Sequence, residues 1–282
     1  MVKIISDSTC DLSAELLEKY DIDILPLHIL LGEDEYRDGV DITPEEIFAW
    51  SDANKTAPKT SAPALTEAIE LLRPYTEAGR PVVCFSISGS MSTSGNVMRL
   101  AADELEAAEL VTVIDSQNLS TGIGLLVIEA AILAKEGKTA AEIQERVEEL
   151  RPKVRASFVV DTLTYLYRGG RCSAAAAMAG SVLKLHPKIV VTDGAMDASK
   201  KYRGKLSAVI LDYTKDMEEE MKAARKERVF ITHSGCDRAI VEAVRAYLAG
   251  LGQFTDILET RAGGVVSSHC GPGTLGVLFI AQ

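Results

Sequence analysis

A segment rich in hydroxyl side chains follows an apolar run in the first third of the chain. Residues 86–96 contain five serines, one threonine and two glycines, directly after the apolar run 81–85. Serine and threonine oxygens cap helices by accepting from free N–H groups of the first turn, but capping uses only one or two of them. A helix start also presents unpaired N–H groups and the positive end of its dipole. The segment therefore predicts either an anion pocket built without lysine or arginine, or a polar turn in solvent.

Two further groups of side chains fit such a pocket. His269 lies between serines and a Gly-Pro-Gly turn, and Thr60 and Ser61 lie between two prolines. Together with Ser92, these side chains would form a ring of neutral donors suited to a carboxylate, at ~1.5–3 kcal/mol for each charge-assisted hydrogen bond. The alternative interpretations are that His269 is a surface residue and that Thr60 and Ser61 only cap the helix that follows them.

The sequence lacks the motifs of common phosphate, metal and hydrolase sites. It contains no GxxxxGK[ST] loop, no GxGxxG after a strand, no HExxH and no GxSxG. The four histidines are scattered, which argues against a metal site. A triad of Ser92, His269 and Asp115 can be drawn, although nothing in the spacing requires it. We therefore expect no cofactor, no metal and no catalytic residue, and the alternative is a small-anion enzyme, either a Ser-His hydrolase or a phosphoryl-transfer protein.

The composition is that of a globular protein with an acidic surface. The 282 residues are 47% hydrophobic and 25% charged, with a net charge of −11. Nucleic-acid binding is driven by basic surface, so a nucleic-acid partner is not expected. No apolar run approaches the ~20 residues of a membrane span and the first residues do not resemble a signal peptide, which favours the cytoplasm. The five cysteines form no CxxC pair, so we expect reduced thiols.

Alternating strands and helices must position these side chains. In the first half, the apolar pattern predicts strands at 3–7, 23–31, 81–85 and 110–114, and helices at 13–20, 65–75, 97–110, 120–136 and 139–150. Thr43-Pro44 is a further helix start, while residues 32–39 and 58–63 are expected to be loops. Arg151-Pro152 breaks the alternation. We therefore predict an N-terminal α/β domain over 1–152, with a mostly parallel sheet and helices on both faces.

The remaining residues, 153–282, predict a C-terminal α/β domain with a mixed sheet and helices. Strands are expected at 156–160, 188–192, 228–235, 255–260 and 275–281, and helices from 163, at 174–183, at 212–227 and from 237. Residues 200–205 are expected to be a basic turn and 261–274 a loop. The small residues of 174–183 favour close helix packing, and the alternative is a thin wall beside a ligand.

Four predicted strands end in small polar residues just before a helix. These ends are Ser6-Asp7-Ser8, the segment 86–94, Asp115-Ser116 and Thr232-His233-Ser234. In open α/β sheets the carboxyl ends of the strands form the ligand crevice. A pocket is therefore expected at this edge, although the pattern does not name its ligand.

Five short motifs are spread along the chain in a specific order. They are KTSAP at 59–63, ISGSMS at 87–92, VIDS at 113–116, LxYLxRGGRxS at 163–173 and HCGPGTLG at 269–276. Each motif is weak alone, but the ordered set resembles the DegV family of bacterial fatty-acid-binding proteins. The likeness runs from Ser6 to Gly276 and so covers nearly the whole chain.

The resemblance implies a two-domain α/β protein that buries a long-chain fatty acid, with 153–282 as the lipid-binding domain. It implies that the carboxylate is held by Thr60, Ser92 and His269, with Ser61 and Thr274 as neighbours. The family usually reads Leu-Ser-Gly-Thr where this chain has Met-Ser-Thr-Ser at 91–94. Ser90 and Ser94 therefore stay open as alternatives to Ser92.

The resemblance also implies a partner enzyme. Relatives in the family hand the bound acid to a fatty acid kinase, which phosphorylates the carboxylate to an acyl phosphate with ATP. Arg171 and Arg203 match arginines implicated in docking the kinase catalytic subunit. The chain itself would then be a non-catalytic carrier. A protein-interaction scaffold without a cavity is the remaining alternative.

Overall fold

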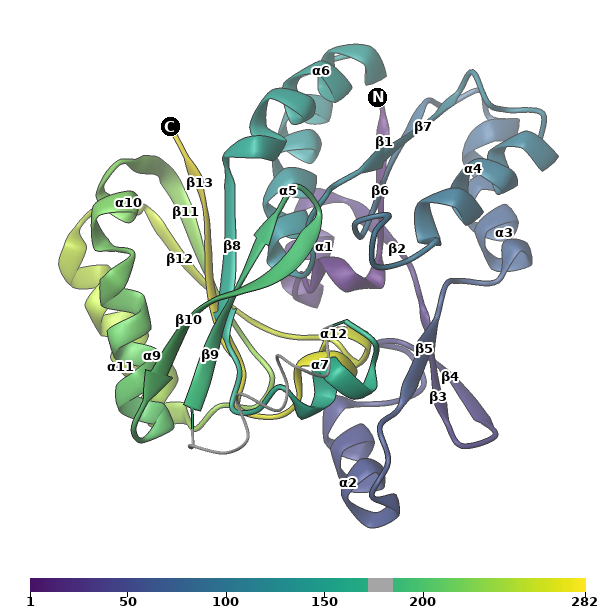
Figure 1. Ribbon diagram of the computed structural model, residues 1–282. Coiled ribbons are helices and arrows are strands. Elements are labelled where there is room, and N and C mark those ends of the chain that lie inside the picture. The colour runs from purple at the N-terminus through teal and green to yellow at the C-terminus, as the bar shows by residue number, and fades with distance from the viewer. Residues whose placement is uncertain (172–184) are drawn as a thin grey trace.

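The computed structural model describes residues 1–171 and 185–282 and shows an α/β fold with three sheets (Figure 1). A parallel sheet and a larger mixed sheet stand side by side, and a small third sheet lies at one end of the parallel sheet. The predicted α/β class, with one parallel and one mixed sheet, is confirmed. Within the described ranges, no helix is long and apolar enough to cross a membrane.

The parallel sheet carries helices on both faces. Its strand order is β2-β1-β6-β7, and the strands are β1 (Lys3–Asp7), β2 (Ile22–Leu25), β6 (Val82–Ser86) and β7 (Val111–Asp115). Successive side chains of β1 point to opposite faces. Ile4 packs in a cluster with α1 (Ala14–Tyr20), α5 (Thr121–Lys135) and α6 (Ala140–Leu150). Ile5 packs in another cluster with α3 (Leu65–Glu77) and α4 (Ser94–Glu104).

All six strands of the mixed sheet follow residue 153. Their order is β10-β9-β8-β13-β11-β12, and only β11 and β12 run parallel. The strands are β8 (Val154–Val159), β9 (Leu185–Thr192), β10 (Ala195–Arg203), β11 (Ala224–His233), β12 (Asp256–Arg261) and β13 (Leu275–Ala281). One face is covered by α9 (Leu206–Asp216), α10 (Glu218–Lys222) and α11 (Arg238–Leu251).

The helix α5 lies between the two large sheets. Ile123, Leu126 and Ile128 share one core cluster with Phe85 of the parallel sheet and Phe158 of the mixed sheet. Eleven of the 15 residues of this helix are buried, as expected of a helix that is apolar on most of its surface. The two sheets are therefore joined through one continuous core.

The third sheet departs from the predicted elements. It has the order β4-β3-β5, from β3 (His28–Leu31), β4 (Asp34–Arg37) and β5 (Lys59–Ser61), with α2 (Pro44–Asn54) nearby. The predicted strand 23–31 is wrong as one element, because the chain leaves the parallel sheet at Pro26, whose missing N–H cannot continue a ladder. The predicted loops 32–39 and 58–63 contain β4 and β5, which are stabilised by pairing with β3 on either side.

Three expectations for the second half are also wrong. The predicted loop 261–274 contains α12 (Gly264–Cys270), and the predicted basic turn 200–205 overlaps the end of β10. The predicted helix 212–227 is divided, because α9 ends at Asp216, α10 ends at Lys222 and β11 begins at Ala224. A short helix from 163 is confirmed as α7 (Thr164–Arg168). The predicted helix 174–183 lies outside the described residues.

Candidate functional site

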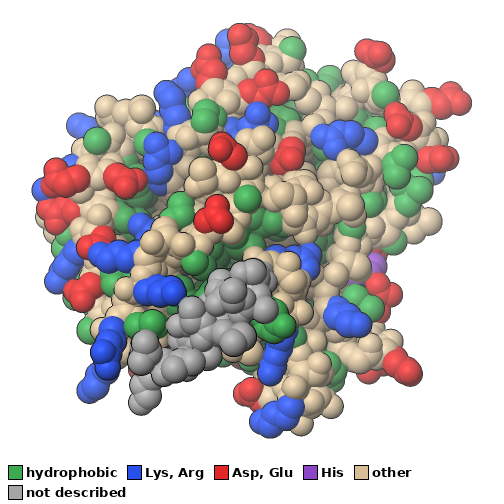
Figure 2. Space-filling model, viewed as in Figure 1, with side chains coloured by type: hydrophobic (Ala, Val, Ile, Leu, Met, Phe, Trp, Pro, Cys, Tyr) green, Lys and Arg blue, Asp and Glu red, His purple; other side chains and the backbone are tan. Residues whose placement is uncertain are grey.

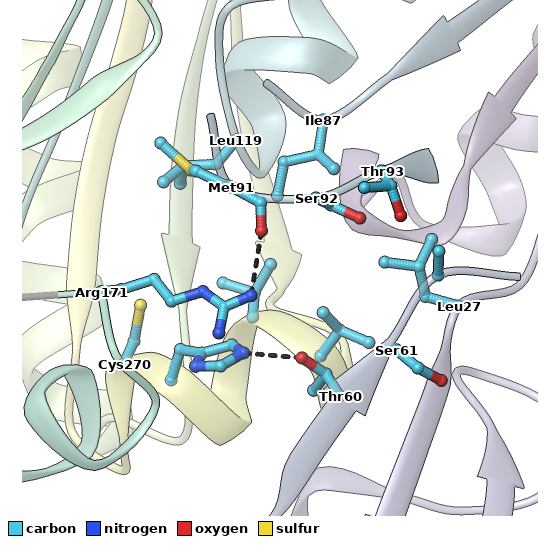
Figure 3. Close-up of a pocket in the computed structure, with 14 residues that line it drawn as sticks. Leu27, Thr60, Ser61, Ile87, Met91, Ser92, Thr93, Leu119, Arg171 and Cys270 are labelled. Carbon is cyan, nitrogen blue, oxygen red and sulfur yellow. Dashed lines mark hydrogen bonds between the residues drawn. The ribbon is translucent and has the colours of Figure 1, made fainter. Parts of the chain in front are cut away.

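A cavity of about 380 Å³ lies where the parallel sheet, the third sheet and α12 meet. Four of the residues predicted to bind the carboxylate line it: Thr60, Ser61, Ser92 and His269. Thr60 Oγ1 and His269 Nε2 are 2.8 Å apart, although 209 positions separate them in the sequence. Figure 3 shows Thr60 and Ser61 on one side of the cavity and Ser92 and Thr93 on the other. The size is within the ~300–1,000 Å³ of small-molecule pockets.

Two buried carboxylates from the first half of the chain position α12, which carries His269. Asp11 Oδ1 accepts from the N–H of Gly263 at 2.8 Å, and Asp38 Oδ1 accepts from that of Gly264 at 2.7 Å. A carboxyl oxygen at a helix N-terminus satisfies an N–H group that would otherwise have no partner within the helix. Burial raises the pKa of both carboxyls, that of Asp11 to about 8. The helix that carries the imidazole is thus held by two side chains that precede His269 by more than two hundred positions in the sequence.

His269 is neutral at physiological pH. Burial lowers its pKa to about 4, and the nearby charge of Arg171 contributes in the same direction. Its Nδ1 is buried and has no hydrogen-bond partner among the described residues. Gly169 leaves room for the ring, because a Cβ there would lie 2.1 Å from Nδ1. A neutral imidazole can donate one hydrogen bond but supplies no positive charge.

Arg171 lies in the wall of the cavity, so the expectation of a pocket without lysine or arginine is wrong. Its Nη2 donates to the carbonyl oxygen of Met91 at 2.9 Å, and the side chain extends between Met91 and Thr60 (Figure 3). Burial lowers the pKa of this guanidinium, which nevertheless stays charged. The family resemblance implied only partner docking for Arg171. Arg171 follows a turn at Gly170, whose φ is 72°, but its place in the cavity depends on the contact with the distant Met91, which has no local signal in the sequence.

The structure separates the roles of the serines in 86–94. The hydroxyls of Ser88 and Ser90 both donate to the carbonyl oxygen of Gly194, in the turn between β9 and β10. Ser94 is fully buried. Ser92 faces the cavity, and its Oγ accepts from the N–H of Ser94 at 3.2 Å. Of the three serines left open by the sequence, Ser92 is therefore the one placed at the cavity.

Two predicted residues are not brought to this cavity. Thr274 is buried, and its hydroxyl donates to the carbonyl oxygen of Cys270 at 2.9 Å. It lines a smaller inner space of about 20 Å³ beside the main cavity. Arg203 is exposed at the end of β10, opposite Leu185.

The inner space continues the main cavity toward the mixed sheet. Leu119, Val266 and Cys270 line both spaces. Beyond them the walls include Phe158 and Leu278, whose side chains belong to the core around α5. These lining residues have no signal in the sequence, because an apolar residue beside a cavity has the same pattern as one in a filled core.

The same geometry does not assemble the triad drawn from the sequence. The carboxylate of Asp115 accepts from the backbone N–H groups of Gly89 and Gln117 at 3.2 and 2.8 Å. The Nε2 of His269 pairs with Thr60 instead of Ser92. Within the described ranges, no group of His, Cys, Asp and Glu side chains is arranged to hold a metal ion.

Comparison with known proteins identifies the family. Residues 1–282 match the family described as "Uncharacterised protein, DegV family". The chain belongs to the DegV family. The DegV domain-containing protein CPE1310 of Clostridium perfringens is 33% identical over 285 residues, which cover 100% of this chain and 99% of the relative.

Two solved structures share the whole architecture. A DegV family protein from Thermus thermophilus, described by its fatty acid binding, is 31% identical with a TM-score of 0.89, covering 100% of this chain and 99% of that one. A stearic acid-binding protein from Eubacterium ventriosum is also 31% identical, with a TM-score of 0.87 and coverage of 100% and 98%. The likeness to both structures therefore extends over the two large sheets and the connections between them.

Proposed function

We propose that this protein binds a long-chain fatty acid in the 380 Å³ cavity, with the carboxylate at Thr60, Ser92 and His269. The observation that carries the proposal is the cavity itself, which has polar donors at one end and apolar residues toward the interior. The two relatives described as fatty-acid-binding, each 31% identical over the whole chain, support it.

The polar end suits a single carboxylate. Hydroxyl groups of Thr60 and Ser92 and the neutral imidazole of His269 are donors without charge, and the guanidinium of Arg171 supplies one positive charge beside them. Donors to a charged acceptor contribute ~1.5–3 kcal/mol each. The head group is therefore recognised by geometry, and the nearby cation offsets the cost of bringing its charge out of water.

The apolar end suits an acyl tail. Each buried methylene contributes about 0.8 kcal/mol, so a tail of roughly fifteen carbons contributes on the order of 10 kcal/mol before ordering costs. Leu119, Val266 and Cys270 mark the path inward, because they line both the main cavity and the inner space. Most of the affinity would come from the tail and the orientation from the head group.

We further propose that the protein is a non-catalytic carrier in the cytoplasm, which presents the carboxylate to a fatty acid kinase. The position of the polar end near the protein surface supports this, since Ser61 and Thr93 line the cavity and are exposed. Arg203 is exposed and accessible for docking, while Arg171 is shared between the surface and the cavity wall. The test is kinase-dependent formation of acyl phosphate, which this chain should support and the Arg203→Ala variant should weaken.

Substitution of Thr60 tests the fatty acid site. The protein is expressed in bacteria and purified, and mass spectrometry after denaturation should show a bound fatty acid. Thr60→Val removes one hydroxyl but keeps the shape, so affinity for palmitate should fall about tenfold. Thr66→Val makes the same change at an exposed position of α3 and should leave affinity unchanged. Absence of any acyl chain, with no uptake on titration, would overturn the proposal.

A further inference from the structure

A second large cavity, of about 490 Å³, shares no lining residue with the fatty acid site. It lies between the start of β8, the strands β9 and β10, α10 and the segment after β7. Gln117 and Asn118 contribute from the first half of the chain, and Ser199 from the mixed sheet. The cavity is therefore a recess between the mixed sheet and the segment that follows β7, with a volume in the range of small-molecule sites.

Three basic side chains line this cavity: Arg151, Arg155 and Lys188. The chain as a whole carries a net charge of −11, and acidic and basic side chains are interspersed over the face seen in Figure 2. The cavity has two carboxylates, Asp193 and Glu220, against its three cations. Its lining thus has the opposite charge balance to the whole molecule.

The two guanidinium groups are held mainly by neutral acceptors. Arg151 Nη1 donates to the carbonyl oxygen of Asp115 at 3.0 Å, and Arg155 Nη1 donates to that of Pro152 at 3.1 Å. The nearest carboxylate oxygen of Glu220 lies 3.7 Å from Arg155 Nε, beyond hydrogen-bond length, and both side chains are largely exposed. Carbonyl oxygens orient both groups, and Arg155 also forms an ion pair with Glu220, but each fork keeps donors that no hydrogen bond uses.

Lys188 provides the third charge from inside the cavity. Its side chain is half-buried on β9, and its ammonium lies 5.5 Å from the ring centre of Tyr213. Within the described ranges this ammonium has no hydrogen bond or close ion pair, and the carboxylates of Glu220 and Asp216 act on its charge from a greater distance. Burial lowers the pKa of Lys188. A half-buried ammonium without an acceptor is stabilised by any anion that enters the cavity.

We propose that this cavity binds a small phosphorylated anion, held by Arg151, Arg155 and Lys188. Guanidinium forks match the geometry of phosphate oxygens, and lysine adds a point charge. A recess of this size admits a small molecule, whereas a polymer would need an extended basic surface. The phosphate could belong to an inorganic ion or to a nucleotide, and both present the same oxygens to these side chains.

Titration of the full chain with pyrophosphate and, separately, with ADP tests the proposal by isothermal calorimetry. At least one probe should bind, and preference for pyrophosphate or for ADP would identify the source of the phosphate. Lys188→Gln and Arg155→Gln should each weaken that binding about tenfold. Lys201→Gln removes the same charge from an exposed position of β10 that does not line the cavity, and it should change affinity less than twofold.

Three outcomes would overturn the proposal. One is no binding of either probe, a second is unchanged binding in both cavity variants, and a third is an equal loss in Lys201→Gln, which would indicate non-specific attraction. Should Lys188→Gln fail to fold, as judged by circular dichroism, the exposed Arg155 decides the test. Palmitate affinity is measured in parallel and should stay unchanged in all variants, which separates this site from the proposed fatty acid site.

Discussion

Gly169 provides the space that the imidazole of His269 occupies. A Cβ on Gly169 would lie 2.1 Å from His269 Nδ1, far inside van der Waals contact, and 3.3 Å from the carbonyl oxygen of Tyr165. The φ of Gly169 is −77°, which any residue adopts. Glycine is therefore required here by a side chain that comes from another part of the chain, and the backbone conformation does not demand it.

Substitution of Gly169 by alanine should displace His269. The added methyl group forces the ring or α7 to move, so the free energy of unfolding should fall by about 1–3 kcal/mol. Palmitate affinity should fall as well, because the Thr60–His269 pair is disturbed. Urea unfolding and ligand titration measure the two effects.

A matched glycine provides the control for this prediction. Gly250 lies on α11, where an added methyl group would have no neighbouring atom within 4 Å. Gly250→Ala should leave palmitate affinity unchanged and should raise stability by up to about 1 kcal/mol, because alanine favours helix. Equal behaviour of the two variants would contradict the role given to Gly169.

Candidate site residues can be identified from the sequence, but the residues that they contact in the fold cannot. Thr60 and His269 were predicted because, together with Ser92, they would form a ring of neutral donors for a carboxylate, and because they match motifs of the DegV family. Arg171 was missed as a cavity residue, because its position depends on the carbonyl of Met91, eighty positions away. Such a contact has no local signature in the sequence.

The helix α12 begins without a capping side chain of its own. Its N-cap residue is Gly263, and the carboxylates of Asp11 and Asp38 accept from the first N–H groups. Asp38 also accepts from the hydroxyl of Ser8 at 2.8 Å, and that hydroxyl accepts from the N–H of Leu27. One carboxylate thus connects the helix that carries His269 to two other segments of the site.

Removal of the Asp38 carboxylate should loosen α12. Asp38→Ala leaves the N–H of Gly264 and the hydroxyl of Ser8 without acceptors, which should cost about 1–3 kcal/mol. Palmitate affinity should fall too, since His269 lies on the same helix. Asp41→Ala is the control: this carboxylate pairs with Arg37 in solvent, so its removal should cost less than about 1 kcal/mol and spare binding. Unchanged palmitate affinity in Asp38→Ala would contradict the positioning role.

Helices and strands whose ends are marked by their own residues could be predicted from the sequence. Those that depend on contacts with distant residues could not. The helix α6 has the capping box of Thr139 and Glu142 in its own sequence, and it begins and ends where predicted. The segment of α12 was predicted to be a loop, because it begins with two glycines and has no capping side chain of its own. Its acceptors are Asp11 and Asp38, which lie far away in the sequence. The strand β5 has only three residues, and it exists because it pairs with β3.

At the scale of the molecule, the two large sheets share α5 and one core. The α/β class followed from the alternation of apolar runs and helical patterns, and the parallel and mixed sheets are both present. A division near residue 152 remains a prediction. The third sheet and α12 could not be inferred, because they bring residues 28–61 of the first half against residues 264–270 of the second. The candidate site forms at this contact.

A buried ion pair adds to the connection through α5. Glu129 on α5 accepts from Arg225 at 3.0 Å and also pairs with Arg228, and both arginines lie on β11 of the mixed sheet. The side chains of Glu129 and Arg228 are only 12% and 9% exposed. A buried charge that loses its partner is costly, because neither water nor an opposite charge then stabilises it.

Glu129→Gln should therefore lower the stability of the whole chain without changing the candidate site. The variant keeps the side-chain shape but leaves Arg228 without a carboxylate, so unfolding should become easier by about 3 kcal/mol. Unfolding by urea should remain one transition, because the core around α5 includes both sheets.

Glu136→Gln is the control, because it changes an exposed residue just past the end of the same helix; its free energy of unfolding should stay within about 0.5 kcal/mol of that of the parent. Palmitate affinity should be unchanged in both variants, since neither residue lines the cavity. Two separate transitions would show that the sheets are not coupled through α5, and a loss of stability no larger than that of Glu136→Gln would contradict the role given to the ion pair.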